Sequence, residues 1–312
     1  MAEEYPVIDV RNLVVEYGKG DKKNRAVGGI SFNVKQGESV GFIGANGAGK
    51  TTTIKVLMGF LFPQGGEVRV FGEKAGTVAS RKRMGYLPEV ALYYPFMKAR
   101  ELLELYGGLH GLSRRQLKTK IPAILEKIGL KGKSEVLLKN FSKGMQQRLG
   151  IAQAIIADPE LLIFDELSSG LDPMGRYDLR QVLLDLKKRG HSIFFSSHEL
   201  SEVEFLCDRV IMIHRGKIVT EAPVKDLMKP LNLFEIEFQI PDGAEMPGAV
   251  KKYDPAKQNG SWKVLINDVE GYSEAVSALA EINAVIINTS SKTRSLEEYF
   301  IDLVENREGG EE

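Results

Sequence analysis

A glycine-rich segment, Gly44 to Thr51 (GANGAGKT), constrains the fold of this chain more than any other part of the sequence. The apolar run SVGFI precedes it and the helix-compatible run TTIKV follows it, so the segment joins a strand to a helix. Glycines let successive backbone N–H groups converge on phosphate oxygens, and the N-terminus of the helix adds the positive end of its dipole. A plain glycine-rich turn is the alternative, and the Lys-Thr pair argues against it. The pattern predicts a phosphate-binding loop with contacts from Asn46, Gly47, Ala48, Gly49, Lys50, Thr51 and Thr52.

The chemistry of this loop follows from its last residues. Lys50 is expected to bridge the β- and γ-phosphates of a nucleotide, and Thr51 to bind magnesium. A second element supports this prediction: the apolar run 161–164 (LLIF) ends in Asp165 and Glu166. Ligands bind at the carboxyl ends of the strands in open parallel sheets. We therefore expect Asp165 to hold the magnesium ion and Glu166 to polarise an attacking water, although two acids after a strand can also simply open a loop.

The order of short apolar segments along the chain predicts its architecture. Strand-like runs alternate with amphipathic helical patterns, which is typical of an α/β domain with a largely parallel sheet. Residues 98–128 instead read as consecutive helices, broken at Gly107-Gly108 and at Gly111. We expect this part to be a helical insertion.

Prolines and a restart of the strand pattern indicate two domains. Pro223 and Pro230 interrupt the pattern of strands and helices, and alternating strands and helices begin again after Pro230. The predicted organisation is a nucleotide-hydrolysing domain over 1–222 with its helical insertion at about 90–150, a linker at 223–230, a small α+β domain over 231–305 and an acidic tail at 306–312.

Composition limits the kinds of partner and the cellular compartment that we expect for this protein. The 42 Lys and Arg residues balance 42 Asp and Glu residues, so we expect no nucleic acid partner, although a neutral total can hide local patches. The single cysteine, Cys207, excludes an intrachain disulfide and favours a buried packing role. The acidic N-terminus has no secretory signal, and apolar runs are far shorter than the ~20 residues of a membrane helix. We expect a cytoplasmic protein.

Further segments, taken in order with the two nucleotide motifs, carry a family resemblance. From about residue 5 to 222 the chain resembles the ABC ATPases. The matching segments are Tyr17 at the adenine-stacking position, Tyr86–Glu89 at the Q-loop, Phe141–Arg148 (FSKGMQQR) at the signature segment, Ser169–Pro173 at the D-loop, and Ser196–Glu199 (SSHE) at the switch histidine.

The resemblance implies a fold and a mechanism. The fold would be a RecA-like core sheet with an N-terminal antiparallel β part and a helical insertion. A second ATPase subunit, identical or different, would complete a head-to-tail dimer with two Mg-ATP at the interface. Each ATP would sit on one subunit's phosphate loop and be capped by Ser142 and Gly144 of the other. His198 would contact the γ-phosphate, Asp172 would act across the interface, and Glu89 would join the magnesium ligands.

Several positions depart from the usual family pattern. Glu89 stands where Gln is common; a carboxylate can still bind magnesium, yet it adds negative charge beside the phosphates. Lys143 and Met145 replace Gly and Gln in the signature, and Leu167 replaces Pro. With the C-terminal unit, these variants resemble stand-alone ATPase subunits of drug, antibiotic or ion exporters. That resemblance implies attachment to the inner face of the cell membrane through a separate integral-membrane permease.

Alternatives to these interpretations stay open at this point. The aromatic segment within 86–105 either receives the coupling helices of a permease or packs the core of the insertion. Tyr17 either stacks on adenine or packs a turn. A soluble ABC ATPase of translation, DNA repair or cluster assembly is disfavoured because the chain has one continuous cassette and no heptad array. A non-hydrolytic regulator is disfavoured because Lys50, Asp165, Glu166 and His198 are all present.

Overall fold

The structure is a computed structural model that describes residues 5–18, 23–166, 173–197, 199–228, 230–241, 243–258, 260–293 and 296–300. Its contacts divide the chain into two compact units, Met1–Val224 and Lys225–Glu312, and each unit is described by itself. The division lies inside the predicted linker 223–230. Within that segment the structure has the end of strand β10 (Lys217–Pro223), helix α8 (Val224–Leu227) and the first residue of strand β11 (Pro230–Gln239).

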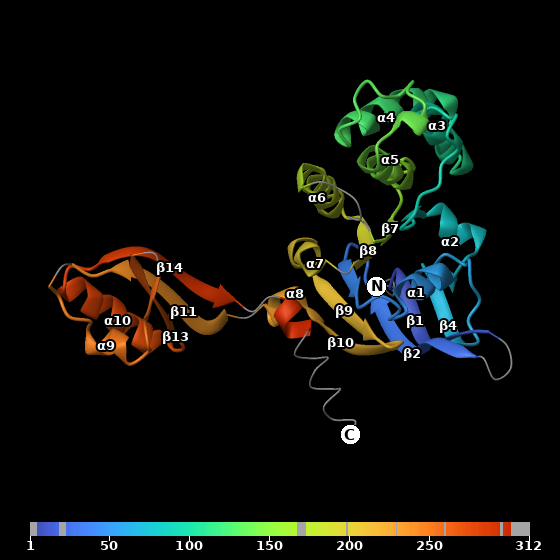
Figure 1. The fold of residues 1–312 in the computed structure, drawn as a ribbon. Helices are drawn as coiled ribbons and strands as arrows, with labels where there is room; N and C mark the ends of the chain where they lie inside the picture. The colour runs from blue at the N-terminus through green and yellow to red at the C-terminus, as the bar shows by residue number, and fades with distance from the viewer. Residues whose placement is uncertain are drawn as a thin grey trace. The chain divides into compact units, whose positions relative to one another are not determined.

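A twisted, largely parallel sheet forms the centre of the first unit (Figure 1). Five neighbouring strands run parallel and the sixth, at one edge, is antiparallel to its neighbour. Every residue of β3, β7 and β8 is buried, which explains why the apolar residues of these strands occur in uninterrupted runs and do not alternate with polar ones. The predicted fold class is confirmed. In spatial order the strands are β10 (Lys217–Pro223), β9 (Arg209–His214), β3 (Ser39–Ile43), β8 (Ser192–Ser197), β7 (Leu161–Asp165) and β6 (Met84–Leu87).

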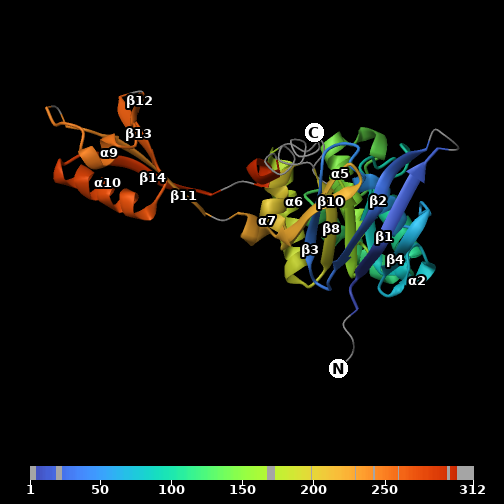
Figure 2. The same cartoon turned by 90° about the horizontal axis from the view of Figure 1, so that it is seen from below.

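An antiparallel sheet covers one side of this core (Figure 2). Alternating residues of its strands point into a shared apolar cluster. Phe32 of β2 stacks on Phe42 of β3 and Phe194 of β8, with ring centroids 5.6 and 5.8 Å apart. These contacts join the two sheets. The strands are β2 (Asn24–Val34), β1 (Ile8–Tyr17), β4 (Gly65–Val70) and β5 (Glu73–Lys74).

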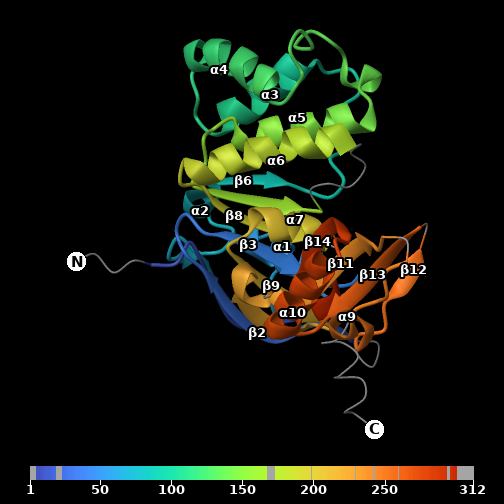
Figure 3. The same cartoon turned by 90° about the vertical axis from the view of Figure 1, so that its left-hand side faces the viewer.

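The helical insertion groups α3 (Ala99–Leu109), α4 (Arg114–Lys127) and α5 (Lys143–Ile155) around one apolar cluster. Figures 1 and 3 show these helices at one end of the first unit, with the antiparallel sheet at the other. The predicted helix break at Gly107-Gly108 was wrong, because α3 continues through both glycines. A Cβ at Gly107 would lie 2.3 Å from Leu117 Cδ2, so the missing side chain lets α3 pack closely on α4.

Helices α6 (Pro173–Lys188) and α7 (Leu200–Leu206) connect strands of the core sheet, whereas α1 (Lys50–Leu57) and α2 (Val78–Lys82) connect the core sheet with the antiparallel sheet. The thiol of Cys207, directly after α7, is buried, as expected, and burial raises its pKa. In the part of the chain that the structure describes, no helix is long and apolar enough to span a bilayer.

The second unit is a four-stranded antiparallel sheet with two helices on one face (Figure 1). Its core joins Ile236 and Phe238 of the sheet to Ala275 and Leu279 of α10. This is the α+β architecture that the sequence predicts. In spatial order the strands are β12 (Ala256–Gln258), β13 (Ser261–Ile266), β11 (Pro230–Gln239) and β14 (Val285–Thr293), and the helices are α9 (Gly248–Lys251) and α10 (Val269–Glu281).

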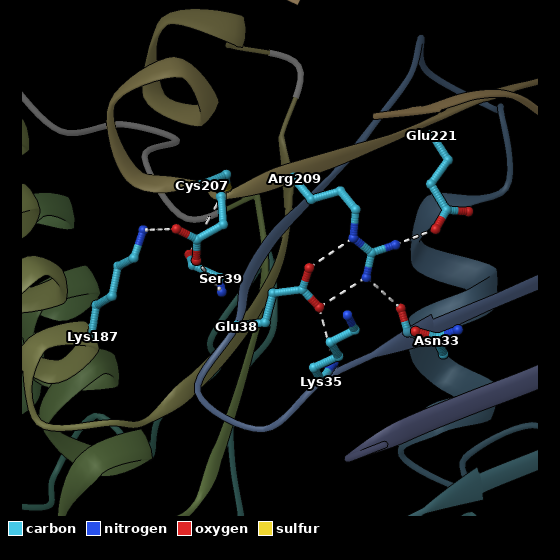
Figure 4. A network of polar contacts seen from close by, with 9 residues as sticks. Asn33, Lys35, Glu38, Ser39, Lys187, Cys207, Arg209 and Glu221 are labelled. Atoms are coloured by element: carbon cyan, nitrogen blue, oxygen red, sulfur yellow. Dashed lines mark hydrogen bonds and ion pairs between the residues drawn. The ribbon is translucent and has the colours of Figure 1, made fainter. Parts of the chain in front are cut away.

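An ionic cluster centred on Arg209 ties four segments of the first unit together (Figure 4). The guanidinium donates to both Glu38 oxygens at 2.7 and 2.8 Å, to the Asn33 carbonyl at 2.7 Å, and to Glu221. Burial opposes ionisation of Glu38, yet the hydrogen bonds from Arg209 and from the Lys35 N–H, together with the positive charges of both residues, prevail and lower its pKa. A lowered pKa stabilises the fold above the ordinary glutamate pKa of about 4.3, and this stabilisation is lost as the pH falls through the lowered value.

Replacing Arg209 with Met should therefore reduce the free energy of unfolding by about 3 kcal/mol, because it leaves Glu38 half-buried without its cation. The matched control is Arg69→Met, since the pair of Arg69 with Glu67 is about half exposed (48% and 50%). Breaking that pair should change stability by less than about 1 kcal/mol. Urea denaturation measures the free energy of unfolding of both variants. The unfolding transition to follow is the one whose midpoint ATP shifts, because it reports on the unit that binds the nucleotide. Equal stability of the two variants would contradict this account of the cluster.

Candidate nucleotide site

The glycine-rich loop follows β3 and leads directly into α1. Gly47 and Gly49 have φ angles of 79° and 111°, which residues with a side chain rarely adopt. A Cβ at Gly49 would also lie 2.7 Å from the carbonyl oxygen of Ala26, so only glycine fits there. The first N–H groups of α1 have no partner within the helix and favour an anion at its start. The loop therefore has the backbone geometry that phosphate binding requires.

Lys50 is held on the inside of this loop. Its Nζ donates to the carbonyl oxygens of Gly44 at 2.7 Å and Ala45 at 3.3 Å, and lies 3.4 Å from Glu166 Oε1. The Lys50 side chain is 6% exposed and that of Glu166 10%. The ammonium group thus lies among carbonyl oxygens and next to the carboxylate of the residue that follows β7.

The two acids at the end of β7 are both buried. Oδ1 of Asp165 accepts hydrogen bonds from Thr51 Oγ1 at 3.1 Å and from Ser196 Oγ at 2.7 Å. Glu166 has a φ of 53°, which is unusual for a residue other than glycine. The parallel pairing of β7 with β8 and β8 with β3 brings the acids to the same sheet edge as the loop.

A cavity of about 370 Å³ opens at this edge. It joins the phosphate loop to Glu89 and Glu166, which lie far apart in the sequence. Ala26 of β2 also lines it, and sequence reasoning missed this residue because a small apolar side chain on a strand carries no chemical signal. The lining residues are Ala26, Asn46, Gly47, Gly49, Lys50, Thr51, Thr52, Glu89 and Glu166.

Tyr17 lies next to the loop, at the end of β1. Its hydroxyl oxygen is 3.3 Å from Thr52 Oγ1, and the side chain is partly exposed. Ala48 is buried behind the loop, where its N–H donates to Ala45 O and its carbonyl accepts from Gly216 N. The ring of Tyr17 is thus accessible beside the loop, whereas Ala48 supports the loop from within.

Other predicted site residues do not meet at this cavity. Ser142 caps the N-terminus of α5 by accepting from Met145 N at 3.3 Å, and Gly144 lies in the first turn. Neither lines the cavity. His198 and Asp172 lie outside the described residues, so their predicted roles stay predictions.

The oxygen groups around the cavity suit magnesium, which prefers carboxylate, hydroxyl, water and phosphate oxygens. Thr51 and Asp165 already lie in hydrogen-bond contact, and Glu89 lines the same cavity. Among the described residues no group of three or more His, Cys, Asp and Glu could hold a metal by themselves. The donor set therefore fits an ion that is shared with a nucleotide.

The aromatic segment after Glu89 divides between two environments. Tyr93 and Met97 pack against the apolar cluster of the insertion, whereas Leu92, Tyr94 and Phe96 are 90%, 74% and 75% exposed. The packing interpretation is thus confirmed for Tyr93 and Met97, whereas docking of a permease on the exposed residues stays a prediction.

A phosphate-binding loop followed by a helix, and a neighbouring strand that ends in buried acids, define a P-loop nucleoside triphosphatase. The family model described as "ABC transporter" matches residues 27–169. The bacitracin transport ATP-binding protein BcrA of Bacillus licheniformis is 36% identical over 308 residues, 96% of this chain and 97% of BcrA. The Nod factor export ATP-binding protein I of Burkholderia orbicola is 36% identical over 242 residues, 77% of this chain and 78% of that protein.

A solved ATP-binding subunit of an ABC transporter superimposes with a TM-score of 0.65 at 30% identity, over 71% of this chain and 91% of that one. The chain belongs to the ABC transporter ATP-binding proteins, and it is an ATPase of that family. The predicted family, fold and enzyme class are confirmed.

Proposed function

We propose that this protein is the ATP-hydrolysing subunit of an exporter whose membrane-spanning part is a separate polypeptide. The observation that carries the ATPase part is the convergence of Lys50, Asp165 and Glu166 at one edge of the core sheet. The similarity to a bacitracin transport protein and a Nod factor export protein supports export as the direction.

Different residues of the site bind the phosphates, bind magnesium and activate the attacking water. Backbone N–H groups of the loop and the Lys50 ammonium bind the phosphates. Thr51, Asp165 and Glu89 would hold a magnesium ion, which would offset phosphate charge when bound. Because Lys50 Nζ lies 3.4 Å from Glu166, phosphate oxygens compete with this carboxylate for the same ammonium group. Glu166 then serves as the base that polarises the attacking water.

A second ATPase subunit, here a second copy of this chain, completes the site. The cavity is lined by the phosphate loop, Glu89 and Glu166, but not by Ser142 or Gly144 of the same chain. α5 has 13 residues, and its N-terminus can offer N–H groups to an anion. We infer that the partner's signature segment caps the phosphates, with His198 and Asp172 acting at that interface.

A second cavity, of about 360 Å³, supports the membrane partner. Phe60 and Leu92 at this cavity are 57% and 90% exposed. Docking an apolar segment at this cavity would remove the Phe60 and Leu92 side chains from water. This is the surface on which we place the permease.

The substitution Leu92→Asp tests this surface. The Glu166→Gln protein, trapped with Mg-ATP bound, should co-purify with a polytopic membrane protein. Adding Leu92→Asp should abolish this co-purification, because it puts a charge on the docking surface. The matched control is Leu109→Asp, which changes a 70% exposed leucine of α3 outside the cavity and should leave co-purification intact.

Mass spectrometry of gently solubilised membranes identifies the co-purifying proteins. If only ribosomes, nucleic acid or soluble proteins are found with the Glu166→Gln protein, the exporter proposal fails and a soluble ABC ATPase replaces it. If Leu92→Asp retains the membrane protein, the permease docks elsewhere.

A further inference from the structure

We propose that Ser196 is a positioning residue for ATP hydrolysis, whose hydroxyl fixes the carboxylate of Asp165 and the backbone of Glu166 at the same time. The inference rests on the proposed roles of those two acids. Ser196 does not line the nucleotide cavity, so it acts through the acids and not on the substrate.

The register of the sheet sets this contact. Ser196 lies on β8, next to Asp165 on β7 in the parallel pairing, and is fully buried. Its Oγ donates to Asp165 Oδ1 at 2.7 Å and accepts from the Glu166 N–H at 3.1 Å. A hydroxyl has a single proton to donate. Since that proton is directed to Asp165, the orientation of the Ser196 hydroxyl is fixed by both acids together.

The first consequence concerns the carboxylate of Asp165. Among the described residues, Thr51 is the other donor to Oδ1, at 3.1 Å, and Thr51 is itself a proposed magnesium ligand. Ser196 is therefore the donor that holds this carboxylate without taking part in metal binding. Hydrogen-bond partners of this kind orient the ligand and tune its hold on the metal.

The second consequence concerns the direction of Glu166. With φ at 53°, its backbone adopts a left-handed conformation that a residue with a side chain disfavours. The Glu166 N–H donates to the carbonyl oxygen of Ser196 at 3.2 Å as well as to its hydroxyl. These two contacts hold the turn that aims the Glu166 carboxylate at Lys50, 3.4 Å away. Losing the hydroxyl loosens this turn.

Ser196→Ala tests the proposal, with Ser192→Ala as the matched control. Ser192 lies on the same strand and is also fully buried, but its hydroxyl accepts from Gly37 N at 2.9 Å, at the opposite end of β8. In Ser196→Ala we expect kcat to fall by about 10–100-fold, with the KM for ATP changed far less. We also expect Mn²⁺ to bind the ADP-loaded protein about tenfold more weakly, as measured by electron paramagnetic resonance of free Mn²⁺.

Ser192→Ala should keep both quantities within about twofold, since the altered hydroxyl does not touch either acid. Thermal unfolding of both variants separates this effect from a general loss of stability. If Ser196→Ala keeps wild-type kcat and Mn²⁺ affinity while Glu166→Gln stops turnover, the positioning role is wrong and the proposed site stands. If Glu166→Gln also turns over normally, the site assignment itself fails.

Discussion

Glu166→Gln is expected to lower kcat for ATP hydrolysis by about 10²–10⁴-fold while ATP binding is retained, because general-base catalysis contributes on that order. The amide has nearly the same shape as the carboxylate but cannot take a proton from water. Its loss of charge leaves Lys50 with the carbonyl oxygens of Gly44 and Ala45 as partners, so the phosphate loop keeps its form.

The control for this variant is Glu160→Gln, which makes the same change just before β7, at the end remote from the cavity. Glu160 is paired with Arg83 and is 47% exposed, so turnover should stay within about twofold of the wild type. Phosphate release under saturating Mg-ATP measures all three proteins. Turnover in Glu166→Gln equal to that of Glu160→Gln would remove Glu166 as the base.

Lys50→Ala is expected to weaken ATP binding itself by about 30-fold or more, equivalent to about 2 kcal/mol for losing a buried charged partner. The effect has two sources. The phosphates lose a buried cation, and the Glu166 carboxylate loses the ammonium group at 3.4 Å and then repels the nucleotide. The affinity for ATP should therefore fall in Lys50→Ala, whereas Glu166→Gln should retain ATP binding and lose turnover.

Lys55→Ala is the matched control, because Lys55 lies on the same helix α1 but is exposed in its last turn. Its ATP affinity should stay within about twofold of the wild type. Isothermal titration with Mg-ATP, in the Glu166→Gln background to prevent turnover, gives the dissociation constants. Wild-type affinity in Lys50→Ala would contradict the assignment of the phosphate loop.

Local patterns carried most of what could be predicted from the sequence. The phosphate loop depends on glycines at fixed offsets between a strand and a helix, and the acidic strand end depends on an apolar run followed by Asp165 and Glu166. The alternation of strands with helices fixes the parallel sheet, whose carboxyl edge then holds both motifs.

Tertiary contacts account for what the sequence did not reveal. Ser196 was recognised only as part of the switch-histidine segment, and its contact with Asp165 was missed because that contact comes from the register between β7 and β8. Gly107 read as a helix breaker, yet its missing side chain makes room for Leu117. The sequence pattern of the aromatic segment could not separate buried from exposed residues, although Tyr93 packs into the apolar cluster of the insertion and Leu92 is exposed. His198 and Asp172 stay predictions from the family resemblance.

We propose that ATP joins two cassettes and that hydrolysis through Glu166 separates them. Sedimentation of the purified Glu166→Gln protein, with and without Mg-ATP, measures this association. We expect a single 34.6 kDa chain without nucleotide, a dimer with Mg-ATP, and no dimer when Lys50→Ala is added. A Glu166→Gln protein that binds Mg-ATP and still sediments as a single chain would contradict it.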